Sequence, residues 1–331
     1  MRIAINGFGR IGRSVFRILD QKKDMNVVAI NDLSNQESLA YLLKYDTVMG
    51  KFSGNVNIED NIMNTDNDSI QMLSERDPIN LPWKDLNIDV VIEATGVFTK
   101  RLLLENHLKA GAKKVLLTVP AKDEIDNTIV LGVNEDTLKP EHRIVSNASC
   151  TTNCLAPMAK ILDEAFGIKQ GVMNTVHAYT NDQRLADVPH SDLRRSRAAA
   201  VNIIPTSTGA ARAVGKVLPQ LQGKLDGIAS RVPVPDGSVV DLFLELEKEV
   251  TINDINAVVN EAANSERMKN VLFYSEDPIV SSDIIGNPYS SIYDSKCTKV
   301  NSGKYVRTLN WYDNEWGYSN RVVDLIRLMC N

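Results

Sequence analysis

The sequence lacks the long apolar runs, the basic excess and the repeats that mark several large classes of protein. No stretch approaches the roughly 20 consecutive apolar residues that a membrane-spanning helix needs. The net charge is −5, which argues against a general nucleic-acid-binding protein. No internal repeat or low-complexity tract is present. We therefore expect neither a membrane nor a nucleic acid among the partners of this chain.

Cysteine is also scarce, because the chain has only four: Cys150, Cys154, Cys297 and Cys330. Their spacing fits no disulfide scaffold, and the pair Cys150 and Cys154 has no second pair of ligands to complete a zinc site. Residues 1–6 are typical of a short strand that leads into a glycine turn rather than of a signal peptide. We therefore expect reduced thiols, a cytoplasmic location and no bound metal.

The chain begins with a strand, a glycine turn, a helix and a second strand. Residues 2–5 form a short apolar strand that leads directly into Gly7-x-Gly9-x-x-Gly12. A helical face of apolar residues follows, and residues 26–32 form a second apolar strand. Gly7 and Gly9 let backbone N–H groups approach a pyrophosphate, and the N-terminus of the helix adds partial positive charge. This order of elements predicts a dinucleotide-binding domain.

The second strand ends in Asp32. In a dinucleotide-binding domain, an acid at this position hydrogen-bonds the ribose hydroxyls of the adenosine. A carboxylate there also repels a 2′-phosphate, so the sequence favours NAD over NADP. The alternative interpretation is an acidic turn residue that only ends a strand.

Two further apolar segments, residues 89–96 and 114–118, predict strands of the same domain. The helical stretch between them predicts a parallel sheet that helices cover on both faces. Ligands bind at the carboxyl ends of such strands, where Thr95, Gly96 and Thr118 lie. These residues are candidates for cofactor binding, with ordinary strand-end capping as the alternative for the two threonines.

After residue 150 the pattern changes to long strand segments with few helices between them. The segments lie at residues 171–180, 228–234, 239–245 and 305–311, with a hairpin turn at 301–304. This pattern predicts a mostly antiparallel sheet. Pro157 is expected to disturb the helix that follows residue 150. The apolar stripe of residues 315–331 predicts an amphipathic helix that packs back on the first domain.

The run of residues 146–154 surrounds Cys150 with hydroxyl and amide side chains. The predicted strand-to-helix junction places this thiol near a helix N-terminus, which is expected to lower its pKa. A cysteine in such a place is a candidate nucleophile, and the alternative is a buried structural cysteine. Cys154, one helical turn later, is either a packing residue or an oxidation partner, and we favour packing.

A thiolate nucleophile needs a base, and the chain has only four histidines. His177 stands out because it lies in a strand-like run, residues 174–180, that ends in polar residues. The same pattern is typical of a core histidine, and spacing along the chain does not show whether His177 meets Cys150.

The chain resembles the phosphorylating glyceraldehyde-3-phosphate dehydrogenase family over essentially its whole length. The matching blocks are NGFGRIGR at residues 6–13, SCTTNC at 149–154, HAYT at 177–180, IIPTSTGAA at 203–211 and WYDNEWGY at 311–318. The resemblance implies a glycolytic or gluconeogenic enzyme that converts D-glyceraldehyde 3-phosphate, inorganic phosphate and NAD to 1,3-bisphosphoglycerate and NADH. It implies a hemithioacetal and a thioester on Cys150, and a homotetramer.

The resemblance also implies roles for single residues, with Cys150 as the nucleophile and His177 as its base. NAD would be held by Arg10, Ile11, Asp32, Arg76, Thr118 and Asn314, the last at the nicotinamide carboxamide. The attacking phosphate would be held by Ser149, Thr151, Thr208, Gly209 and either Arg195 or Arg197, which the sequence does not separate. The substrate's own phosphate would be held by Thr180, Asp182 and Arg231.

These elements together predict an α/β fold, with a Rossmann-type parallel-sheet domain and an α+β catalytic domain whose sheet is mostly antiparallel. The 331 residues suffice for two such domains. We place the NAD-binding domain at residues 1–149, joined by the C-terminal helix 315–331, and the catalytic domain at residues 150–314.

Three other functions stay open at this point. An erythrose-4-phosphate dehydrogenase would use the same cysteine and histidine but release its acid by hydrolysis. A cysteine hydrolase would need no NAD, and the glycine turn with Asp32 argues against it. A non-enzymatic binding role is the third, although no segment of the sequence specifies a partner for it.

Overall fold

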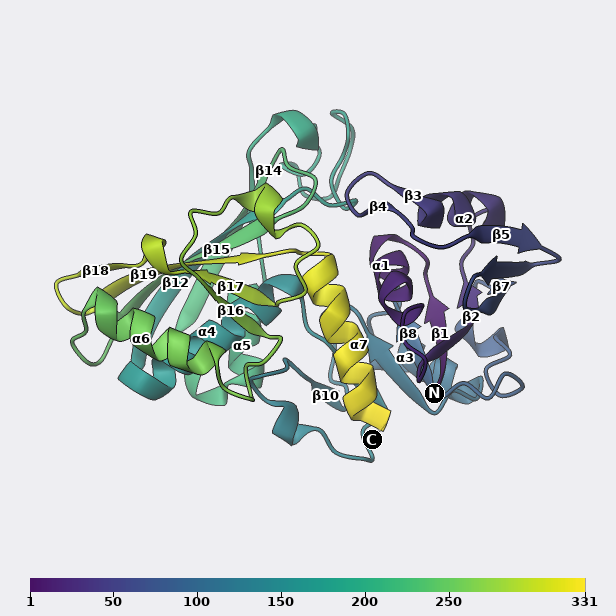
Figure 1. The fold of residues 1–331 in the computed structure, drawn as a ribbon, viewed down its shortest axis with the longest axis horizontal. Helices are drawn as coiled ribbons and strands as arrows, with labels where there is room; N and C mark the ends of the chain where they lie inside the picture. Colours follow the sequence, from purple (N-terminus) through teal and green to yellow (C-terminus); the bar gives the residue numbers. More distant parts are fainter. Residues whose placement is uncertain (331) are drawn as a thin grey trace. The chain divides into compact units, whose positions relative to one another are not determined.

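The computed structural model, which describes residues 1–330, divides the chain into two units (Figure 1). The first unit comprises residues 1–129, residues 136–148 and the C-terminal residues from Ser319 onward. The second unit comprises residues 130–135 and 149–318. Each unit is built on a large sheet of its own.

The first unit contains the alternating strands and helices that its apolar pattern predicts. Its strands are β1 (Arg2–Asn6), β2 (Asn26–Asn31), β3 (Tyr45–Asp46), β4 (Gly50–Lys51), β5 (Val56–Glu59), β6 (Ile62–Thr65), β7 (Ser69–Leu73), β8 (Val90–Glu93), β9 (Lys114–Leu117), β10 (Asn127–Thr128) and β11 (Ile144–Ser146). Its helices are α1 (Arg10–Leu19), α2 (Gln36–Lys44), α3 (Arg101–Lys109) and most of α7 (Trp316–Cys330).

Nine of these strands form one sheet in the order β10-β11-β9-β8-β1-β2-β7-β6-β5. Every neighbouring pair from β10 to β7 is parallel, and β6 and β5 extend the edge in antiparallel fashion. The side chains of β8 are buried on both faces, as helices on both sides of a parallel sheet require. The predicted Rossmann-type parallel sheet is confirmed.

Buried polar side chains connect the strand ends near the glycine turn. The Glu93 carboxylate at the end of β8 is fully buried and accepts a hydrogen bond from Asn6 Nδ2 at 2.6 Å. The Trp83 indole N–H donates to His107 Nδ1 at 3.0 Å, so the imidazole proton lies on Nε2, which is 3.0 Å from Glu93 Oε2. Asn31 Nδ2 donates in turn to Asn6 Oδ1 at 2.7 Å. Because these buried groups satisfy one another, they hold the ends of β1, β2 and β8 in one arrangement.

The C-terminal helix α7 is part of the first unit from Ser319 onward. Arg327 in its last turn forms an ion pair with Asp24 at 2.9 Å. The apolar stripe of the helix is fully buried at Val322, Leu325 and Ile326. Among residues 1–330, none of the helices combines the length and the apolarity needed to cross a bilayer.

The second unit contains three complete α-helices and a sheet of eight strands. The helices are α4 (Cys150–Phe166), α5 (Ala210–Val217) and α6 (Ile252–Ala263). The strands are β12 (Ile168–Ala178), β13 (Ile204–Ser207), β14 (Leu225–Val232), β15 (Ser238–Leu246), β16 (Leu272–Ser275), β17 (Ser291–Asp294), β18 (Lys299–Asn301) and β19 (Tyr305–Tyr312).

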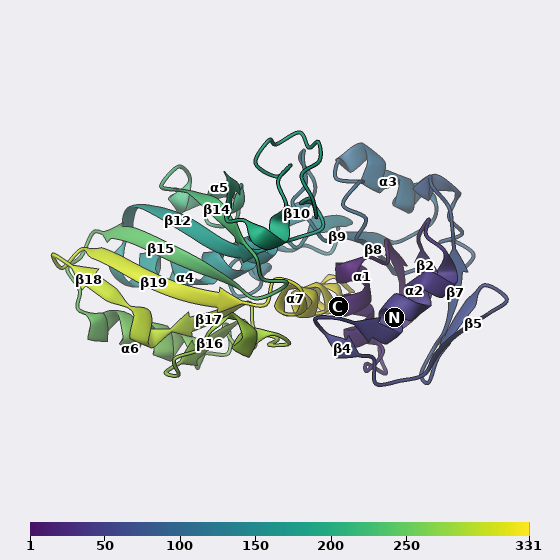
Figure 2. The same ribbon diagram turned by 90° about the horizontal axis from the view of Figure 1, so that it is seen from above.

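The strand order in this sheet is β13-β14-β12-β15-β19-β17-β16, with β18 paired to β19. Figure 2 shows β12, β15 and β19 side by side in its left half. Only the pairs β12–β14 and β16–β17 are parallel among the strand pairs of this described sheet, so the predicted mostly antiparallel sheet is confirmed. The predicted hairpin turn is also confirmed, because Ser302 and Gly303 join β18 to β19 with positive φ angles of 49° and 70°.

The period of two along β12 directs its side chains to opposite faces of the sheet. Met173, Thr175 and His177 are buried on the face that α4 contacts, while Val172 on the other face is 58% exposed. Helix α4 packs on the sheet with its buried residues Leu155, Met158 and Leu162. Burial of such a side chain contributes roughly 1.5–3 kcal/mol, so this face fixes where α4 begins relative to β12. The helix runs unbroken through Pro157, contrary to the expected disturbance, since its packing outweighs one missing hydrogen bond.

Candidate active site

Cys150 is the first residue of α4, at the predicted strand-to-helix junction. Ser149 is the N-cap of the helix, and its Oγ accepts a hydrogen bond from the Thr152 backbone N–H at 3.1 Å. Cys150 as a whole residue is half-buried. The N-terminus of α4 therefore places partial positive charge beside this sulfur.

His177, near the end of β12, lies against this thiol. Its Nε2 is 3.6 Å from Cys150 Sγ, and its Nδ1 is 2.7 Å from the carbonyl oxygen of Ala178. A proton on Nδ1, donated to that carbonyl, leaves Nε2 as the acceptor for the thiol proton. The structure thus brings together the nucleophile and the base whose contact the sequence could not show.

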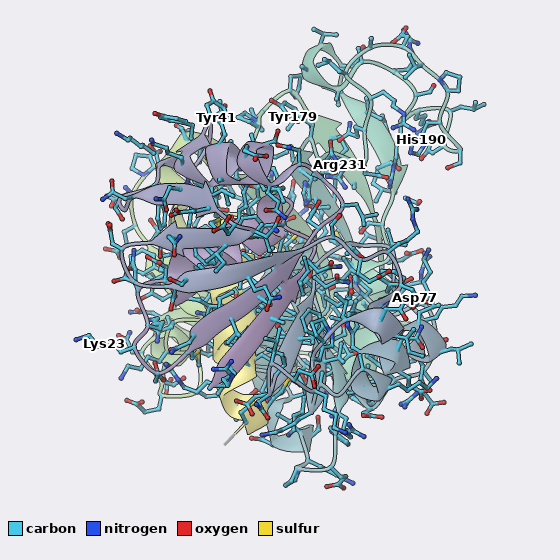
Figure 3. The ribbon with its side chains drawn as sticks, turned by 90° about the vertical axis from the view of Figure 1, so that its right-hand side faces the viewer. Lys23, Tyr41, Asp77, Tyr179, His190 and Arg231 are labelled. Atoms are coloured by element: carbon cyan, nitrogen blue, oxygen red, sulfur yellow. The ribbon has the colours of Figure 1, made fainter. Side chains whose placement is uncertain are left out.

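Arg231 lies beside the base because β14 pairs in parallel with β12 and places it opposite His177. Its Nη1 donates to the Ala178 carbonyl oxygen at 3.0 Å, the acceptor that it shares with His177 Nδ1, and lies 2.9 Å from Nδ1 and 3.5 Å from Thr180 Oγ1. Its Nε has no partner among residues 1–330, which leaves a donor for an anion. Figure 3 labels Arg231, and it labels His190 on the loop that follows β12.

Burial controls the charge state of this pair. Burial raises the pKa of the Cys150 thiol, although the charge of Arg231 and the hydrogen bonds of Thr151 oppose the rise. Burial, with Arg231 as the second cause, lowers the pKa of His177 to about 3. The expected lowering of the thiol pKa by the helix N-terminus is therefore wrong for the resting protein, because desolvation outweighs it. The pair begins as a neutral thiol and a neutral imidazole.

Tyr312 supports this site, although its sequence pattern predicted no role for it. Its hydroxyl lies between Thr151 Oγ1 and Thr175 Oγ1, at 2.8 Å from each. Its ring meets the His177 imidazole edge-on, with centroids 5.9 Å apart and an interplanar angle of 78°. The position of Tyr312 at the end of β19 within the quoted WYDNEWGY block was the only signal for it.

Two hydroxyls that were predicted to hold the attacking phosphate are already bonded within the protein. Thr151 Oγ1 is buried and contacts Tyr312, and Ser149 Oγ contacts both the N–H and the hydroxyl of Thr152. Ser149 and Thr151 therefore lie next to the nucleophile, but their hydroxyls are already bonded to Thr152 and Tyr312.

Arg195 and Arg197 lie in different environments, which the sequence did not reveal. Arg195 Nε donates to Thr206 Oγ1 at 2.8 Å, and its Nη1 forms an ion pair with Asp182. Arg197 instead pairs with the exposed Asp187 at 2.9 Å. Arg195 is thus attached to β13, whereas Arg197 lies on the exposed part of the loop.

The segment that follows β13 has the form of an anion cradle. Gly209 precedes α5, and no atom of the described residues lies within 4 Å of the place where its side chain would begin. Thr208 Oγ1 accepts a hydrogen bond from the Ala210 N–H at 3.2 Å. The N-cap residue of α5 is Gly209, which has no side chain to bond the N–H groups that follow Ala210, so these can face a ligand.

Asn314 follows β19 and is held by a serine that sequence reasoning missed. Ser238 Oγ donates to Asn314 Oδ1 at 2.6 Å and accepts the Ala178 N–H at 3.1 Å. Because Oδ1 is the acceptor, the amide Nδ2 is the group that Asn314 presents as a donor. The only sequence signal for Ser238 was a hydroxyl at the start of a strand.

The first unit shows a cradle that fits a dinucleotide. Gly7 has a φ of +94°, and a Cβ there would lie 2.7 Å from the Thr95 backbone nitrogen, so only glycine fits. At Gly9, by contrast, no atom of residues 1–330 lies within 4 Å of a Cβ position, and none of their side chains caps α1. Asp32 Oδ2 accepts the Phe8 N–H at 2.8 Å, which fixes this carboxylate beside the turn. Open space at a helix N-terminus next to a fixed acid is what a pyrophosphate and a ribose require.

The other predicted cofactor residues of this unit differ in how they are engaged. The Arg10 guanidinium forms two bonds to Asp46, at 2.8 and 3.1 Å, so Arg10 and Ile11 offer backbone rather than side-chain groups to a ligand. Arg76 is exposed after β7.

Thr95 and Thr118 are both engaged at the carboxyl end of the sheet. The Thr95 hydroxyl bonds to the Glu93 carboxylate, and the Thr118 hydroxyl donates to the Glu93 carbonyl at 3.0 Å. Strand-end capping therefore accounts for these two hydroxyls. Gly96, with a φ of +72°, is exposed beside them.

The remaining cysteines add no metal site. All four are free thiols, and Cys154 is buried with Sγ 3.6 Å from Ser291 Oγ and 3.5 Å from the Asn310 carbonyl, which supports a packing role. In the part of the chain that the structure describes, no group of three or more His, Cys, Asp or Glu side chains could hold a metal ion.

Comparison with known proteins gives matches over nearly the whole length. A family model described as glyceraldehyde 3-phosphate dehydrogenase, NAD binding domain, matches residues 1–101, and one described as glyceraldehyde 3-phosphate dehydrogenase, C-terminal domain, matches residues 149–314. The chain is 58% identical to a glyceraldehyde-3-phosphate dehydrogenase of Streptomyces coelicolor, over 98% of this chain and 97% of the relative. It is 56% identical to one of Geobacillus stearothermophilus (98% and 97%) and 58% identical to one of Thermotoga maritima (99% and 98%).

The bonds of Tyr312 predict the effect of removing its hydroxyl. Tyr312→Phe should lower the free energy of unfolding by about 1–3 kcal/mol, because the buried Thr151 and Thr175 hydroxyls lose their shared partner. Tyr41→Phe, at an exposed position on α2, should change it by less than about 0.5 kcal/mol. Urea unfolding of both variants measures the difference, and equal stabilities would contradict this role.

Proposed function

Because this chain belongs to the glyceraldehyde-3-phosphate dehydrogenase family, we propose that it oxidises D-glyceraldehyde 3-phosphate to 1,3-bisphosphoglycerate, using NAD and inorganic phosphate. The chain is an NAD-dependent oxidoreductase of that family. The observation that carries the proposed chemistry is the 3.6 Å contact between Cys150 Sγ and His177 Nε2. A nucleophile with its base, in a chain with a dinucleotide-binding domain, supports covalent oxidation of an aldehyde.

Cys150 and His177 divide the steps between them. Cys150 Sγ adds to the aldehyde carbon, and His177 Nε2 transfers the thiol proton to the new alkoxide, which gives a hemithioacetal. A bound NAD would supply the acceptor for the hydride of that carbon. As the hydride leaves, His177 Nε2 takes the hydroxyl proton and the carbon becomes the carbonyl of a Cys150 thioester.

The thioester is then released by phosphate. An oxygen of inorganic phosphate attacks the thioester carbonyl, and the imidazolium of His177 stabilises the oxyanion that forms. The C–S bond breaks, the acyl phosphate leaves, and His177 returns its proton to the Cys150 sulfur. Each cycle thereby restores the neutral thiol and imidazole of the resting site.

The residues of the first unit would hold the nucleotide. Asp32 would bind the adenosine ribose, and the N–H groups at the start of α1, including those of Arg10 and Ile11, would bind the pyrophosphate. Gly7 and Gly9 allow that approach, and Asn314 would bind the carboxamide through Nδ2. The exposed Arg76 and the strand-end residues Thr95, Gly96 and Thr118 complete this proposed set.

We assign the attacking phosphate to Arg195 rather than Arg197. Arg195 is attached to β13, which leads into the Thr208–Gly209 cradle, whereas Arg197 is committed to Asp187. Ser149 and Thr151 contribute through the N-terminus of α4, since their hydroxyls are already bonded.

Arg231 and Thr180, which lie 3.5 Å apart, would bind the phosphate of the substrate itself. Asp182 cannot hold a phosphate directly, because two anions repel each other. Its ion pair with Arg195 gives it a different role, which is to orient that guanidinium.

The alternatives are less well supported. The relatives and both family models carry the glyceraldehyde 3-phosphate name, so an erythrose-4-phosphate dehydrogenase is not favoured. The NAD-binding domain argues against a cysteine hydrolase, and no described feature singles out a non-enzymatic partner. The cytoplasmic location stays a prediction.

A homotetramer is supported by the uncovered face of the sheet in the second unit. Val172, Ile228 and Phe243 are between 43% and 58% exposed there. A groove of about 750 Å³, lined by Phe243, Tyr305 and Arg307 among others, lies on the same face. Contiguous apolar surface of this kind is typical of a face that another subunit covers.

The thioester mechanism predicts that NADH formation depends on inorganic phosphate. With glyceraldehyde 3-phosphate and NAD, absorbance at the NADH band should rise steadily only when phosphate is present. Cys150→Ser should abolish the rise, and His177→Asn should slow it by about 10²–10⁴-fold. Sustained turnover without phosphate would point to thioester hydrolysis, and no turnover at all from folded protein would contradict the proposed function.

The different environments of the two arginines predict different kinetic effects. Arg195→Leu should raise the KM for inorganic phosphate at least about tenfold, since charge-assisted hydrogen bonds contribute roughly 1.5–3 kcal/mol. Arg197→Leu, the matched control, should change that KM less than about twofold. Steady-state rates over a range of phosphate concentrations measure both constants, and a reversed order of effects would assign the site to Arg197.

The exposed sheet face predicts the oligomeric state. Sedimentation equilibrium should give the mass of four chains, and Phe243→Asp should shift the equilibrium toward smaller species by placing a charge in the covered face. A monomeric wild-type protein would contradict the proposed tetramer.

A further inference from the structure

Two turns at one end of the second unit's sheet carry a pair of buried carboxyl groups. β15 begins at Ser238 and β19 ends at Tyr312, and these two residues are opposite each other in the antiparallel register. The chain before β15 and the chain after β19 therefore leave the sheet at the same end. Asp236 lies on the first turn and Asp313 on the second, and each is 1% exposed.

Both carboxylate oxygens of Asp313 accept hydrogen bonds from backbone N–H groups. Its Oδ1 accepts the backbone N–H groups of Glu315 at 2.8 Å and Trp316 at 2.6 Å, and its Oδ2 accepts that of Gly286 at 2.7 Å. A carboxyl group that accepts three backbone N–H bonds favours its ionised form, because those bonds stabilise the negative charge.

Asp236 is the opposite case. Its Oδ1 accepts the Gly237 N–H at 2.8 Å, but its Oδ2 receives a hydrogen bond from no donor among residues 1–330. The side chains of Asp236 and Asp313 are nevertheless close enough to form a hydrogen bond with each other. Two carboxyl groups can form such a bond only if one of them holds a proton, and the undonated Oδ2 of Asp236 is where that proton belongs.

The charges around Asp236 favour the same assignment. Burial, followed by the negative charges of Asp313 and Glu315, raises the pKa of Asp236 to about 9. A negative charge on Asp236 would also raise the pKa of the Cys150 thiol. Desolvation and two acidic neighbours therefore keep the group neutral at physiological pH.

We propose that Asp236 is a neutral carboxylic acid whose O–H donates to Asp313, and that this bond positions the Asn314 amide for the cofactor. The inference rests on the proposed function, in which Asn314 Nδ2 binds the nicotinamide carboxamide. Asp236 acts through its neighbours: it joins the turn that carries Asn314 to the turn that leads into Ser238, the residue whose hydroxyl holds Asn314 Oδ1 at 2.6 Å. Asp236 is thus a positioning residue.

The proposal has a pH-dependent consequence. When Asp236 ionises, two buried carboxylates face each other with Glu315 nearby, and their repulsion drives the two turns apart. The bond between Ser238 and Asn314 is then strained, so the affinity for NAD should fall at alkaline pH.

The first measurement is the dissociation constant of NAD by isothermal titration calorimetry between pH 6.5 and 10. All proteins carry Cys150→Ser, so that ionisation of the thiol does not contribute. In this parent, NAD affinity should be constant to about pH 8 and fall at least fivefold by pH 10. Asp236→Asn keeps a permanent N–H donor toward Asp313 and should stay within threefold across the range. Asp236→Ala loses the donor and should bind NAD at least fivefold more weakly at every pH.

A matched control separates this effect from the loss of any carboxylate nearby. Asp283 is exposed on the segment whose Ser281 touches Gly237. Asp283→Asn should keep the pH dependence of the parent. If Asp236→Ala does not fold, the comparison of parent, Asp236→Asn and Asp283→Asn carries the test.

The second measurement uses the protein without cofactor. The pKa of Asp236 in the folded state, about 9, exceeds its ordinary value of 3.8, so the folded protein binds a proton that the unfolded chain releases. The stability that this group contributes is complete below pH 3.8 and is lost as pH rises toward 9. The Tm difference between Asp236→Asn and the parent should therefore grow with pH up to about 9 and then level off.

The outcomes distinguish two failures. If the parent binds no NAD at any pH, the proposed function fails and the positioning role with it. If NAD binds with the same pH dependence in the parent and in Asp236→Asn, or if the Tm difference does not change with pH, the positioning role alone is overturned.

Discussion

A buried imidazole beside a permanent cation is the constraint on which the second unit depends. The parallel pairing of β12 with β14 places Arg231 opposite His177, and burial with that positive charge keeps the imidazole neutral. The polar groups around it then need partners, because an unpaired buried donor or acceptor costs about 1–3 kcal/mol. The Ala178 carbonyl serves both His177 and Arg231, and the Tyr312 hydroxyl serves two threonines. The surroundings of the Cys150 thiol are therefore fixed by the hydrogen bonds that these buried polar groups need.

The two units solve different problems with different kinds of structure. The first holds a glycine turn on a parallel sheet, and the buried contacts of Glu93 with Asn6 and His107 fix the strand ends from which the turn departs. In the second unit, the side chains of the candidate site come from strands, from the start of a helix and from a long loop. Its polar groups are therefore connected across the sheet rather than along the chain, as the bridge from Ala178 through Ser238 to Asn314 illustrates.

This difference explains how much of the protein could be predicted from the sequence. The strand, the glycine turn and Asp32 are close along the chain, so spacing alone predicted their arrangement. The contact of Cys150 with His177 depends on how α4 packs on β12, and no local pattern encodes that packing. The pKa of Cys150 was predicted in the wrong direction because desolvation is a property of the folded protein. The separation of Arg195 from Arg197 likewise required the course of the loop, since both residues carry the same charge in the same segment. The pairing of Asp236 with Asp313 depends on strand register, which spacing along the chain does not supply.

The charge of Arg231 also affects how the base responds to a bound anion. Because its charge lowers the pKa of His177, an anion that neutralises Arg231 makes the imidazole a stronger base. A phosphorylated aldehyde would bring such an anion, whereas an aldehyde without a phosphate would leave the base weak. Binding of a phosphorylated substrate would then make His177 a stronger base. Selectivity would arise from this activation of the base as well as from affinity.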